Sequence, residues 1–343
     1  MGRITAIMGA LKDKASQSKA ALLSNPTNTS LNLAVLRATT HSPSAPPDLS
    51  ALLSLGNSSR ATASALISAL MDRLHRTGDS TVALKCLLTI HHVITRGPFI
   101  LQDQLSIFPA SGGRNYLKLS AFRDGASAAT LTLSAWVRFY ARYLETLLFA
   151  SRILGYFVSA SSTAPENLGR DERISAFLNH DLIRDVDSLV VLIEETCKAP
   201  DSFLLESNKL IHEIMRLLSD DNFSIIDETL SRLTELKQRM DCLSFGDSVE
   251  LALALKRLED CTERLSVLFA EQKSSIENSS SLAIELREKI ETSTRVCKER
   301  RLLSFGRKCE SARFPARVAN FEHMLINAEN YAHNNVKNVK MLV

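Results

Sequence analysis

The sequence predicts an all-α protein, with a superhelical α-solenoid in its first half that is extended by a bundle of longer helices. Apolar residues, leucine above all, recur at helical spacing along most of the chain, and no segment alternates convincingly in the way of a strand. Only 12 Gly and 9 Pro occur among 343 residues, which leaves few breaks between helices. Hydrophobic residues make up 45% of the chain, which is enough for a continuous core.

The first predicted helix covers residues 3 to 23 and is amphipathic. Its apolar positions are Ile4, Ile7, Met8, Leu11 and Ala15. Its opposite, basic face carries Arg3, Lys12, Lys14 and Lys19. A narrow apolar stripe beside a basic face suits a helix that lies on anionic lipid. The alternative is that the stripe packs as the first helix of the solenoid, and we favour this interpretation for the part after Lys12.

Helices are next predicted over residues 31 to 40 and 58 to 76, the later one beginning from a Ser cap. The stretch between them, residues 41 to 49, contains prolines at positions 43, 46 and 47. Proline removes a helical hydrogen bond and clashes with the preceding turn, so this stretch is predicted to be a loop.

Residues 81 to 96 form the predicted central helix, because apolar side chains cover almost its whole circumference. Gly97 is expected to end it in a left-handed cap, and Pro98 cannot continue it. A short helix is predicted over residues 99 to 108, and another over 116 to 122 after the break at 111 to 113. Short helices that fold back on one another are typical of an α-solenoid.

A long helix is predicted over residues 131 to 158, with Trp136, Phe139 and Tyr140 on a broad apolar face. Residues 159 to 169 are predicted to be a linker. Beyond it, leucine spacing predicts helices at about 170 to 179, 181 to 198, 202 to 220, 222 to 243, 247 to 272, 280 to 303 and 314 to 333. The predicted organisation is a basic helical superhelix over 1–160, a helical extension over 161–335 and a short tail over 336–343.

Charge is distributed unevenly along the chain. Residues 1 to 160 hold 16 Lys and Arg against 7 Asp and Glu, whereas the remainder holds 25 against 31. A basic end favours an anionic partner, which is a membrane surface or a nucleic acid. Nucleic-acid binding is not expected, because aromatic residues do not alternate with the basic ones and Trp136 is expected to be buried.

Several classes of function are excluded by missing patterns. No run of about 18 uncharged apolar residues predicts a membrane span, and no secretory signal opens the chain, so a cytoplasmic protein is expected. The six cysteines are scattered and are expected to be reduced thiols. No catalytic, nucleotide or metal motif is present, so we expect no enzyme and no cofactor. His91 and His92 point about 100° apart on a helix and are interpreted as core residues rather than metal ligands.

Four segments carry a family resemblance. They are LKCLLTIHHVITRG at 84–97, RATTH at 37–41, SAWVRFYARYLE at 134–145, and the opening MGR with the basic helix that follows it. Together they resemble the ANTH domain of clathrin assembly proteins, which are endocytic adaptors related to epsins, and the plant branch in particular. The resemblance covers residues 3 to about 160. It implies an ENTH/ANTH-like solenoid that continues as one elongated unit.

The resemblance also implies a lipid site. Family members clasp an inositol bisphosphate headgroup with a pattern like KATx6PKxKH, whose first part is similar to the segment from Arg37 to His41. Pro47, Leu49 and Ser50 stand where lysine, lysine and histidine are expected. The implied headgroup residues are therefore Arg37 and His41, with Lys12, Lys14 and Lys19 as auxiliary cations. The loss of two lysines is expected to weaken binding by roughly one to two orders of magnitude. The alternative is that the Arg37 region is structural.

The function implied by the resemblance is that of an adaptor that binds phosphatidylinositol 4,5-bisphosphate in clathrin-coated vesicle formation and endocytosis. Its implied partners are phosphoinositide-containing membrane, clathrin coat components and a vesicle SNARE as cargo, on coated pits and vesicles at the plasma membrane or Golgi apparatus. The last residues, NNVKNVKMLV, contain no DPF, NPF or clathrin-box motif, so the helical domain is expected to make these contacts. The alternative function is a helical protein-interaction scaffold without lipid binding.

Overall fold

Helices account for all the regular structure in the computed structural model, which describes residues 2–23, 26–42, 47–56, 58–107, 115–160, 167–201 and 208–305. These residues contain no strand, and the all-α prediction is confirmed. The chain divides into two compact units, Met1–Thr292 and Ser293–Val343. The boundary predicted near residue 160 stays a prediction, since part of the expected linker lies outside the described residues.

The helices follow one another with short connections. The first six are α1 (Gly2–Leu23), α2 (Pro26–Ala38), α3 (Ser50–Gly56), α4 (Arg60–Arg76), α5 (Ser80–Arg96) and α6 (Phe99–Ser106). The next six are α7 (Ala128–Leu154), α8 (Asn167–Ala176), α9 (Asn179–Cys197), α10 (Lys209–Gln238), α11 (Phe245–Leu268) and α12 (Lys273–Phe305). Two single 3-10 turns, η3 (Met240–Cys242) and η4 (Ala270–Gln272), connect the later helices.

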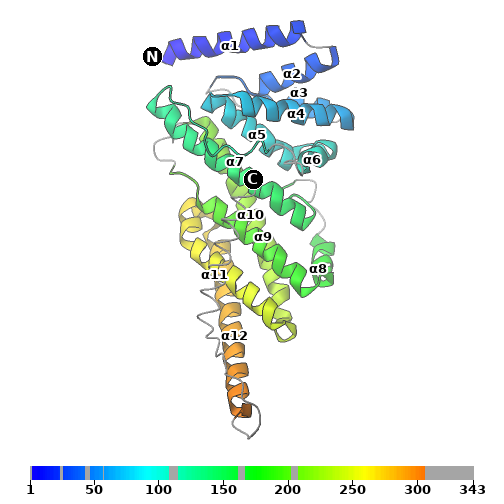
Figure 1. Ribbon diagram of the computed structural model, residues 1–343, viewed down its shortest axis with the longest axis vertical. Helices are drawn as coiled ribbons and strands as arrows, with labels where there is room; N and C mark the ends of the chain where they lie inside the picture. Colours follow the sequence, from blue (N-terminus) through cyan, green and yellow to red (C-terminus); the bar gives the residue numbers. More distant parts are fainter. Residues whose placement is uncertain are drawn as a thin grey trace, which may run out of the picture. The chain divides into compact units, whose positions relative to one another are not determined.

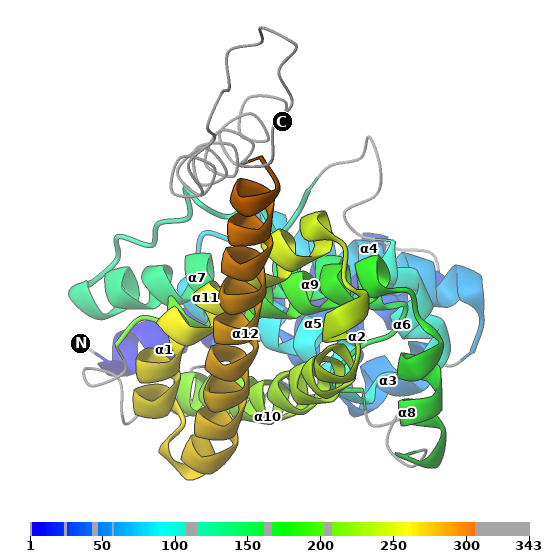
Figure 2. The ribbon, with the colours of Figure 1, turned by 90° about the horizontal axis from the view of Figure 1, so that it is seen from below.

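Within the first unit the helices stack in sequence. Helix α1 packs on α2, α2 on α4, α4 on α5, α5 on α7, α7 on α9 and α9 on α11 (Figure 1). The long helix α10 lies along one side of this stack and contacts α5, α8 and α9 (Figure 2). This repeated stacking is an α-solenoid, in which each helix pair covers the apolar face of the one before it.

Helix α5 is the centre of the N-terminal part, as its sequence predicts. Every residue from Ser80 to Thr95 is buried. The Asp79 carboxylate caps the helix by accepting hydrogen bonds from the backbone N–H groups of Thr81 and Val82. The helix ends at Arg96 as expected, but the left-handed cap predicted at Gly97 is wrong, because its φ is −69°. Glycine is needed there for another reason: a Cβ would lie 2.4 Å from the Val93 carbonyl oxygen.

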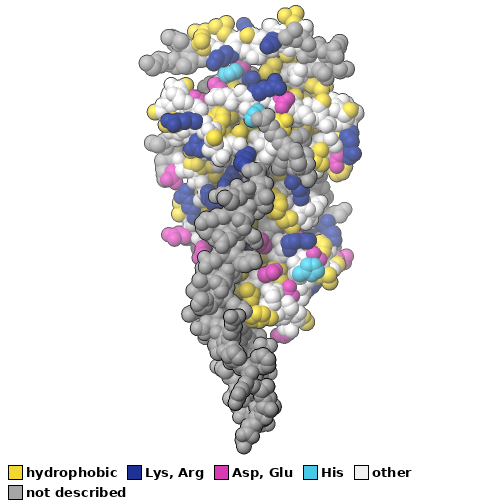
Figure 3. All heavy atoms as spheres, in the orientation of Figure 1, with side chains coloured by type: hydrophobic (Ala, Val, Ile, Leu, Met, Phe, Trp, Pro, Cys, Tyr) yellow, Lys and Arg dark blue, Asp and Glu magenta, His cyan; other side chains and the backbone are white. Residues whose placement is uncertain are grey.

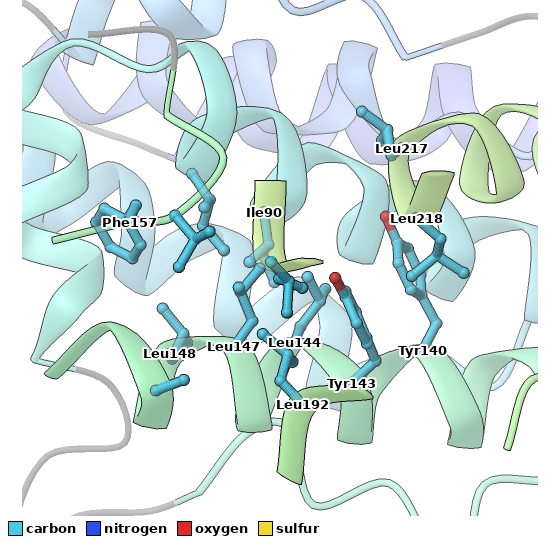
Figure 4. Close-up of a cluster of buried hydrophobic side chains, with 14 of the residues drawn as sticks. Ile90, Tyr140, Tyr143, Leu144, Leu147, Leu148, Phe157, Leu192, Leu217 and Leu218 are labelled. Carbon is cyan, nitrogen blue, oxygen red and sulfur yellow. The ribbon is translucent and has the colours of Figure 1, made fainter. Parts of the chain in front are cut away.

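A cluster of apolar side chains joins α5, α7, α9 and α10. Ile90 of α5 meets Leu144 and Leu147 of α7 and Leu192 of α9 in this cluster (Figure 4). Tyr140 and Tyr143 point from α7 toward α10, with their hydroxyl groups inside the protein (Figure 4). Burial of these large side chains stabilises the packing of the four helices.

Two predictions differ from the structure, and helix α3 was not predicted. Residues 116 to 122 form turns rather than a helix, because Asn115 accepts a hydrogen bond from the Leu117 N–H and Arg138 binds the Phe122 carbonyl. Helix α3 begins at Ser50, directly after the stretch 41 to 49 that was predicted to be a loop, and the described residues of that stretch lie outside helices. The break predicted near residue 221 is absent, since α10 runs on without interruption. The helix predicted over 314–333 lies outside the described residues.

Candidate functional site

Helix α1 is fastened to the end of α2 by one carboxylate. Asp13 accepts hydrogen bonds from the backbone N–H of His41 at 3.0 Å and contacts His41 Nδ1 at 2.6 Å. Gly9, one turn earlier, lies so close that a Cβ there would be 2.9 Å from His41 Cβ. His41 is therefore engaged by α1, and its ring side chain is only 12% exposed.

This attachment decides which face of α1 is covered. Gly9, Asp13 and Ala20 are partly buried, whereas the apolar Ile7, Met8 and Leu11 are 61%, 54% and 58% exposed. The interpretation that the apolar stripe packs after Lys12 is wrong for Ala15, which is exposed. Gly9 and Asp13 make the contact instead, because glycine allows the close approach to His41 and the Asp13 carboxylate accepts the His41 backbone N–H.

The predicted cations lie on the surface near this contact. Lys12 and Lys14 flank Asp13, and Arg37 lies one helical turn before His41. Arg37, Lys12, Lys14 and Lys19 are exposed, and none of them has a hydrogen-bond or ion-pair partner within the described part of the chain. Cationic side chains are spread over the part of the surface formed by the first helices (Figure 3). The structure thus brings Arg37, His41, Lys12 and Lys14 to one end of the first unit.

The turn that precedes α3 has no cationic side chain among its described residues. Pro47, Asp48 and Leu49 occupy it, and Asp48 is exposed. The Asp48 carboxylate accepts hydrogen bonds from the N–H and the hydroxyl of Ser50, at 3.3 and 2.7 Å, at the start of α3. A carboxylate at the beginning of a helix is favourable for the helix dipole but unfavourable for a bound phosphate.

Sequence reasoning missed two cations beneath the segment from Arg37 to His41. Lys85 of α5 is fully buried and donates a hydrogen bond from Nζ to Thr40 Oγ1 at 2.8 Å. Burial lowers the pKa of Lys85 to about 8, although the Asp13 and Asp79 carboxylates act in the opposite direction. Arg73 of α4 lies 3.4 Å from the Thr39 carbonyl oxygen. A lysine inside the apolar pattern of residues 81 to 96 is the sequence signal that could have identified the first of them.

A groove of about 530 Å³ lies between α2 and α4, on the side that α1 reaches with Ala20. Leu31, Val35 and Ala69 line its apolar part, and Arg73 and Arg76 lie at its polar end. Arg76 is paired with Asp72 at 3.5 Å, so the charge at this end is partly neutralised. The groove has room for apolar side chains, but nothing in it resembles a catalytic arrangement.

The two central histidines are core residues. His91 is completely buried and His92 is 5% exposed. His91 Nδ1 lies 2.6 Å from the Tyr140 hydroxyl, and His92 Nε2 lies 3.4 Å from Glu213 Oε1. Across the described ranges, no group of three His, Cys, Asp or Glu residues is arranged to hold a metal ion.

Comparison with known proteins identifies the family. A model of the ANTH domain matches residues 30–284. "Putative clathrin assembly protein At4g40080" of Arabidopsis thaliana is 54% identical over 275 residues, which cover 78% of this chain and 75% of the relative. "Putative clathrin assembly protein At5g10410", from the same plant, is 35% identical over 280 residues, covering 78% of this chain and 80% of the relative. No helix within the described residues is long and apolar enough to cross a bilayer.

Proposed function

The chain belongs to the ANTH-domain family, and on that premise we propose that it is a peripheral membrane adaptor that binds anionic lipid through α1 and the end of α2. ANTH-domain clathrin assembly proteins are adaptors and not enzymes. The observation that carries the lipid part is the exposed apolar stripe of Ile7, Met8 and Leu11 beside exposed, unpaired lysines.

The chemistry of this surface fits a lipid interface. Three large apolar side chains that are more than half exposed on one helix favour transfer into the acyl boundary of a membrane. Each cation near an anionic surface adds about 1 kcal/mol. Lys12, Lys14 and Arg37 have no carboxylate partner in the described residues, so their charge is available to a membrane.

For the headgroup we propose that Arg37 binds the phosphate groups of a phosphoinositide, with Lys12, Lys14 and Lys19 as auxiliary cations. The Arg37 guanidinium can hold a phosphate with two parallel hydrogen bonds. His41 contributes mainly by holding α1 in place, since Asp13 already binds both its backbone N–H and its ring. Asp48 in the next turn opposes an anion, which supports a weaker headgroup site than the family pattern implies.

The adaptor also needs protein partners. The relatives at 54% and 35% identity are named as clathrin assembly proteins, which supports a role in clathrin coat assembly for this chain. A vesicle SNARE is a second proposed partner, because the resemblance to ANTH domains implies such a cargo. The leucines of α10 and α11 are largely buried, so a helical partner there would meet exposed Phe223 and Val267. This proposal is tested by measuring whether any of a panel of SNARE cytosolic segments binds the protein above background.

Liposome co-sedimentation tests the lipid proposal directly. The double variant Lys12→Glu with Lys14→Glu is expected to bind vesicles containing phosphatidylinositol 4,5-bisphosphate at least about tenfold more weakly than the unmodified protein. The matched control is Arg184→Glu with Lys273→Glu, which changes the net charge equally at exposed positions outside the basic half. An equal loss in both variants would indicate a general charge effect and remove α1 from the proposal.

The alternative function, a helical scaffold without lipid binding, makes the opposite prediction. It requires that the unmodified protein stays in the supernatant with anionic vesicles while it still binds clathrin coat components. Replacement of apolar residues in α1 provides a second comparison. The double variant Ile7→Ser with Leu11→Ser should reduce vesicle binding if the apolar stripe enters the membrane. It should leave vesicle binding unchanged if the protein is a scaffold alone.

A further inference from the structure

Two cysteines that are far apart in the sequence meet between α9 and α11. Cys197 is the last residue of α9, and its Sγ lies 3.8 Å from the backbone carbonyl oxygen of Cys261 in α11. Cys197 is partly exposed and Cys261 is 8% exposed, so the pair lies at the edge of the helix interface.

Two arginines of α11 fix the position of these cysteines. Arg257, four residues before Cys261, binds both carboxylate oxygens of Glu194 at 2.8 and 2.6 Å. Arg264, three residues after Cys261, donates to the carbonyl oxygens of Cys197 at 3.3 Å and Ala199 at 2.9 Å. The end of α9 is therefore held against α11 on both sides of the thiols, which keeps them in contact.

We propose that Cys197 and Cys261 are a site of reversible oxidation, at which a hydroperoxide converts the two thiols into an intramolecular disulfide. The site requires no lipid and no partner, so it is independent of the proposed membrane function. A disulfide here would connect α9 directly to α11, and the loop of chain that it closes would contain the whole of α10.

The two sulfurs differ in their electrostatic environment, and therefore in their expected roles in the reaction. The adjacent Cys197 thiol lowers the pKa of Cys261 and Arg257 acts in the same direction, whereas burial, Glu194 and Asp260 act against them. The Cys261 side chain and burial raise the pKa of Cys197, whose thiol donates its proton to the Cys261 backbone carbonyl oxygen. The thiolate is the reactive form of cysteine, so Cys261 is the nucleophile that meets the oxidant and Cys197 is the resolving thiol.

The reaction balances with hydrogen peroxide as oxidant. The Cys261 thiolate attacks one peroxide oxygen, an S–O bond forms, the O–O bond breaks, and hydroxide leaves and takes a proton to become water. The Cys197 sulfur then attacks the Cys261 sulfur of the sulfenic acid. An S–S bond forms, the S–O bond breaks, and the departing hydroxide takes the Cys197 proton. Two thiols lose two electrons in total, and one peroxide is reduced to two waters.

The test is peptide mapping of the full-length protein after graded exposure to hydrogen peroxide, without reductant. We expect a peptide that links Cys197 to Cys261, with a mass two hydrogens below the reduced pair. Cys242 is exposed and Cys86 is completely buried, so they serve as accessible and inaccessible controls in the same molecule. Links to Cys297 or Cys309, or oxidation of Cys242 while both paired cysteines stay reduced, would overturn the proposal.

Single variants separate the roles of the two sulfurs. In Cys197→Ser, a sulfenic-acid probe such as dimedone should label Cys261, because the resolving thiol is gone. In Cys261→Ser, Cys197 should remain unlabelled. Oxidation should also raise the Tm of the unmodified protein by several degrees but not that of Cys197→Ser, because a cross-link constrains the unfolded chain. If neither variant folds, the peptide map of the unmodified protein decides alone.

Discussion

His91 Nε2 lies 2.8 Å from Asp221 Oδ2, and both side chains are completely buried. The approach is not aligned as a hydrogen bond, so it is an electrostatic contact. The same Asp221 oxygen accepts a hydrogen bond from the Tyr143 hydroxyl at 2.5 Å. His91, Tyr143 and Asp221 come from α5, α7 and α10, so one polar cluster joins three helices inside an otherwise apolar core.

Removal of the Asp221 carboxylate should destabilise the protein strongly. Asp221→Ala leaves the Tyr143 hydroxyl without its acceptor and the His91 ring without its carboxylate contact in a dry interior, for which about 3–5 kcal/mol of unfolding free energy is the usual cost. The neighbouring residue supplies the control, because the Asp220 side chain is 59% exposed and pairs with Arg216. Asp220→Ala should cost less than about 1 kcal/mol. Urea unfolding followed by circular dichroism measures both, and similar midpoints would contradict the prediction.

His92 should make the protein sensitive to acid. Burial lowers the pKa of His92 to about 4, and Arg96, His91 and Arg216 act in the same direction while Glu213 opposes them. The unfolded chain, with a histidine pKa of about 6.5, therefore binds the proton first as the pH falls. The contribution of His92 to the free energy of unfolding is fully present above about pH 6.5. It is lost as the pH falls from about 6.5 to about 4, by up to about 3 kcal/mol.

The substitution His92→Gln should flatten this acid limb. Urea unfolding at intervals from pH 7 to pH 4 should show a smaller loss of free energy in His92→Gln than in the unmodified protein. His180, whose side chain is 62% exposed, provides the comparison. The pH profile of His180→Gln should follow that of the unmodified protein, and a flattened profile there would assign the effect to histidine content rather than to burial.

Much of the fold could be predicted from the sequence because its helices have strong signals of their own. The apolar circumference of residues 81 to 96 identified α5 as the central helix, and all of it from Ser80 to Thr95 is buried. Residues 116 to 122 have a helical pattern, but Asn115 and Arg138 satisfy the backbone in turns instead. The spacing of apolar residues does not reveal these side-chain hydrogen bonds, one of which comes from Arg138, 16 residues further along the chain, and this explains the error.

The candidate site was less predictable for the same reason. Lys12, Lys14, Lys19 and Arg37 could be proposed from charge and resemblance, and all four are exposed. The role of Asp13 could not, because its partner His41 is 28 residues away in the sequence. The thiol pair at 197 and 261 was likewise invisible, since only the packing of α9 on α11 brings the two cysteines together.

Loss of the Asp13 carboxylate should release α1 from the solenoid. Asp13→Ala removes both contacts to His41, which are worth about 1–3 kcal/mol for a charged acceptor. Hydrogen exchange should then become faster in α1 but remain unchanged in α5. Lys14→Ala, at the exposed neighbouring position, should leave exchange in α1 as it is. Equal protection of α1 in both variants would show that Asp13 does not hold this helix.

Arg37 provides the sharpest test of the headgroup site. Arg37→Glu should weaken binding to phosphoinositide vesicles by more than tenfold, because a phosphate ligand is replaced by a repulsive charge. Arg60→Glu is the matched control, since the Arg60 side chain is 74% exposed and pairs with Asp103 on a different part of the surface. Vesicle binding of Arg37→Glu equal to that of Arg60→Glu would place the headgroup elsewhere and leave α1 with Lys12 and Lys14 as the main contact.

Restoration of the family turn should act in the opposite direction. Pro47→Lys with Leu49→Lys returns two cations to the turn before α3 and keeps the backbone carbonyl of residue 49, which caps the Leu53 N–H. Vesicle binding should increase by about one to two orders of magnitude, and more at low than at high salt, because the added charges are screened over about 8 Å at physiological ionic strength. A gain that persists in combination with Arg37→Glu would mean that the two lysines act as general surface charge. A gain that requires Arg37 would assign all three residues to one headgroup site.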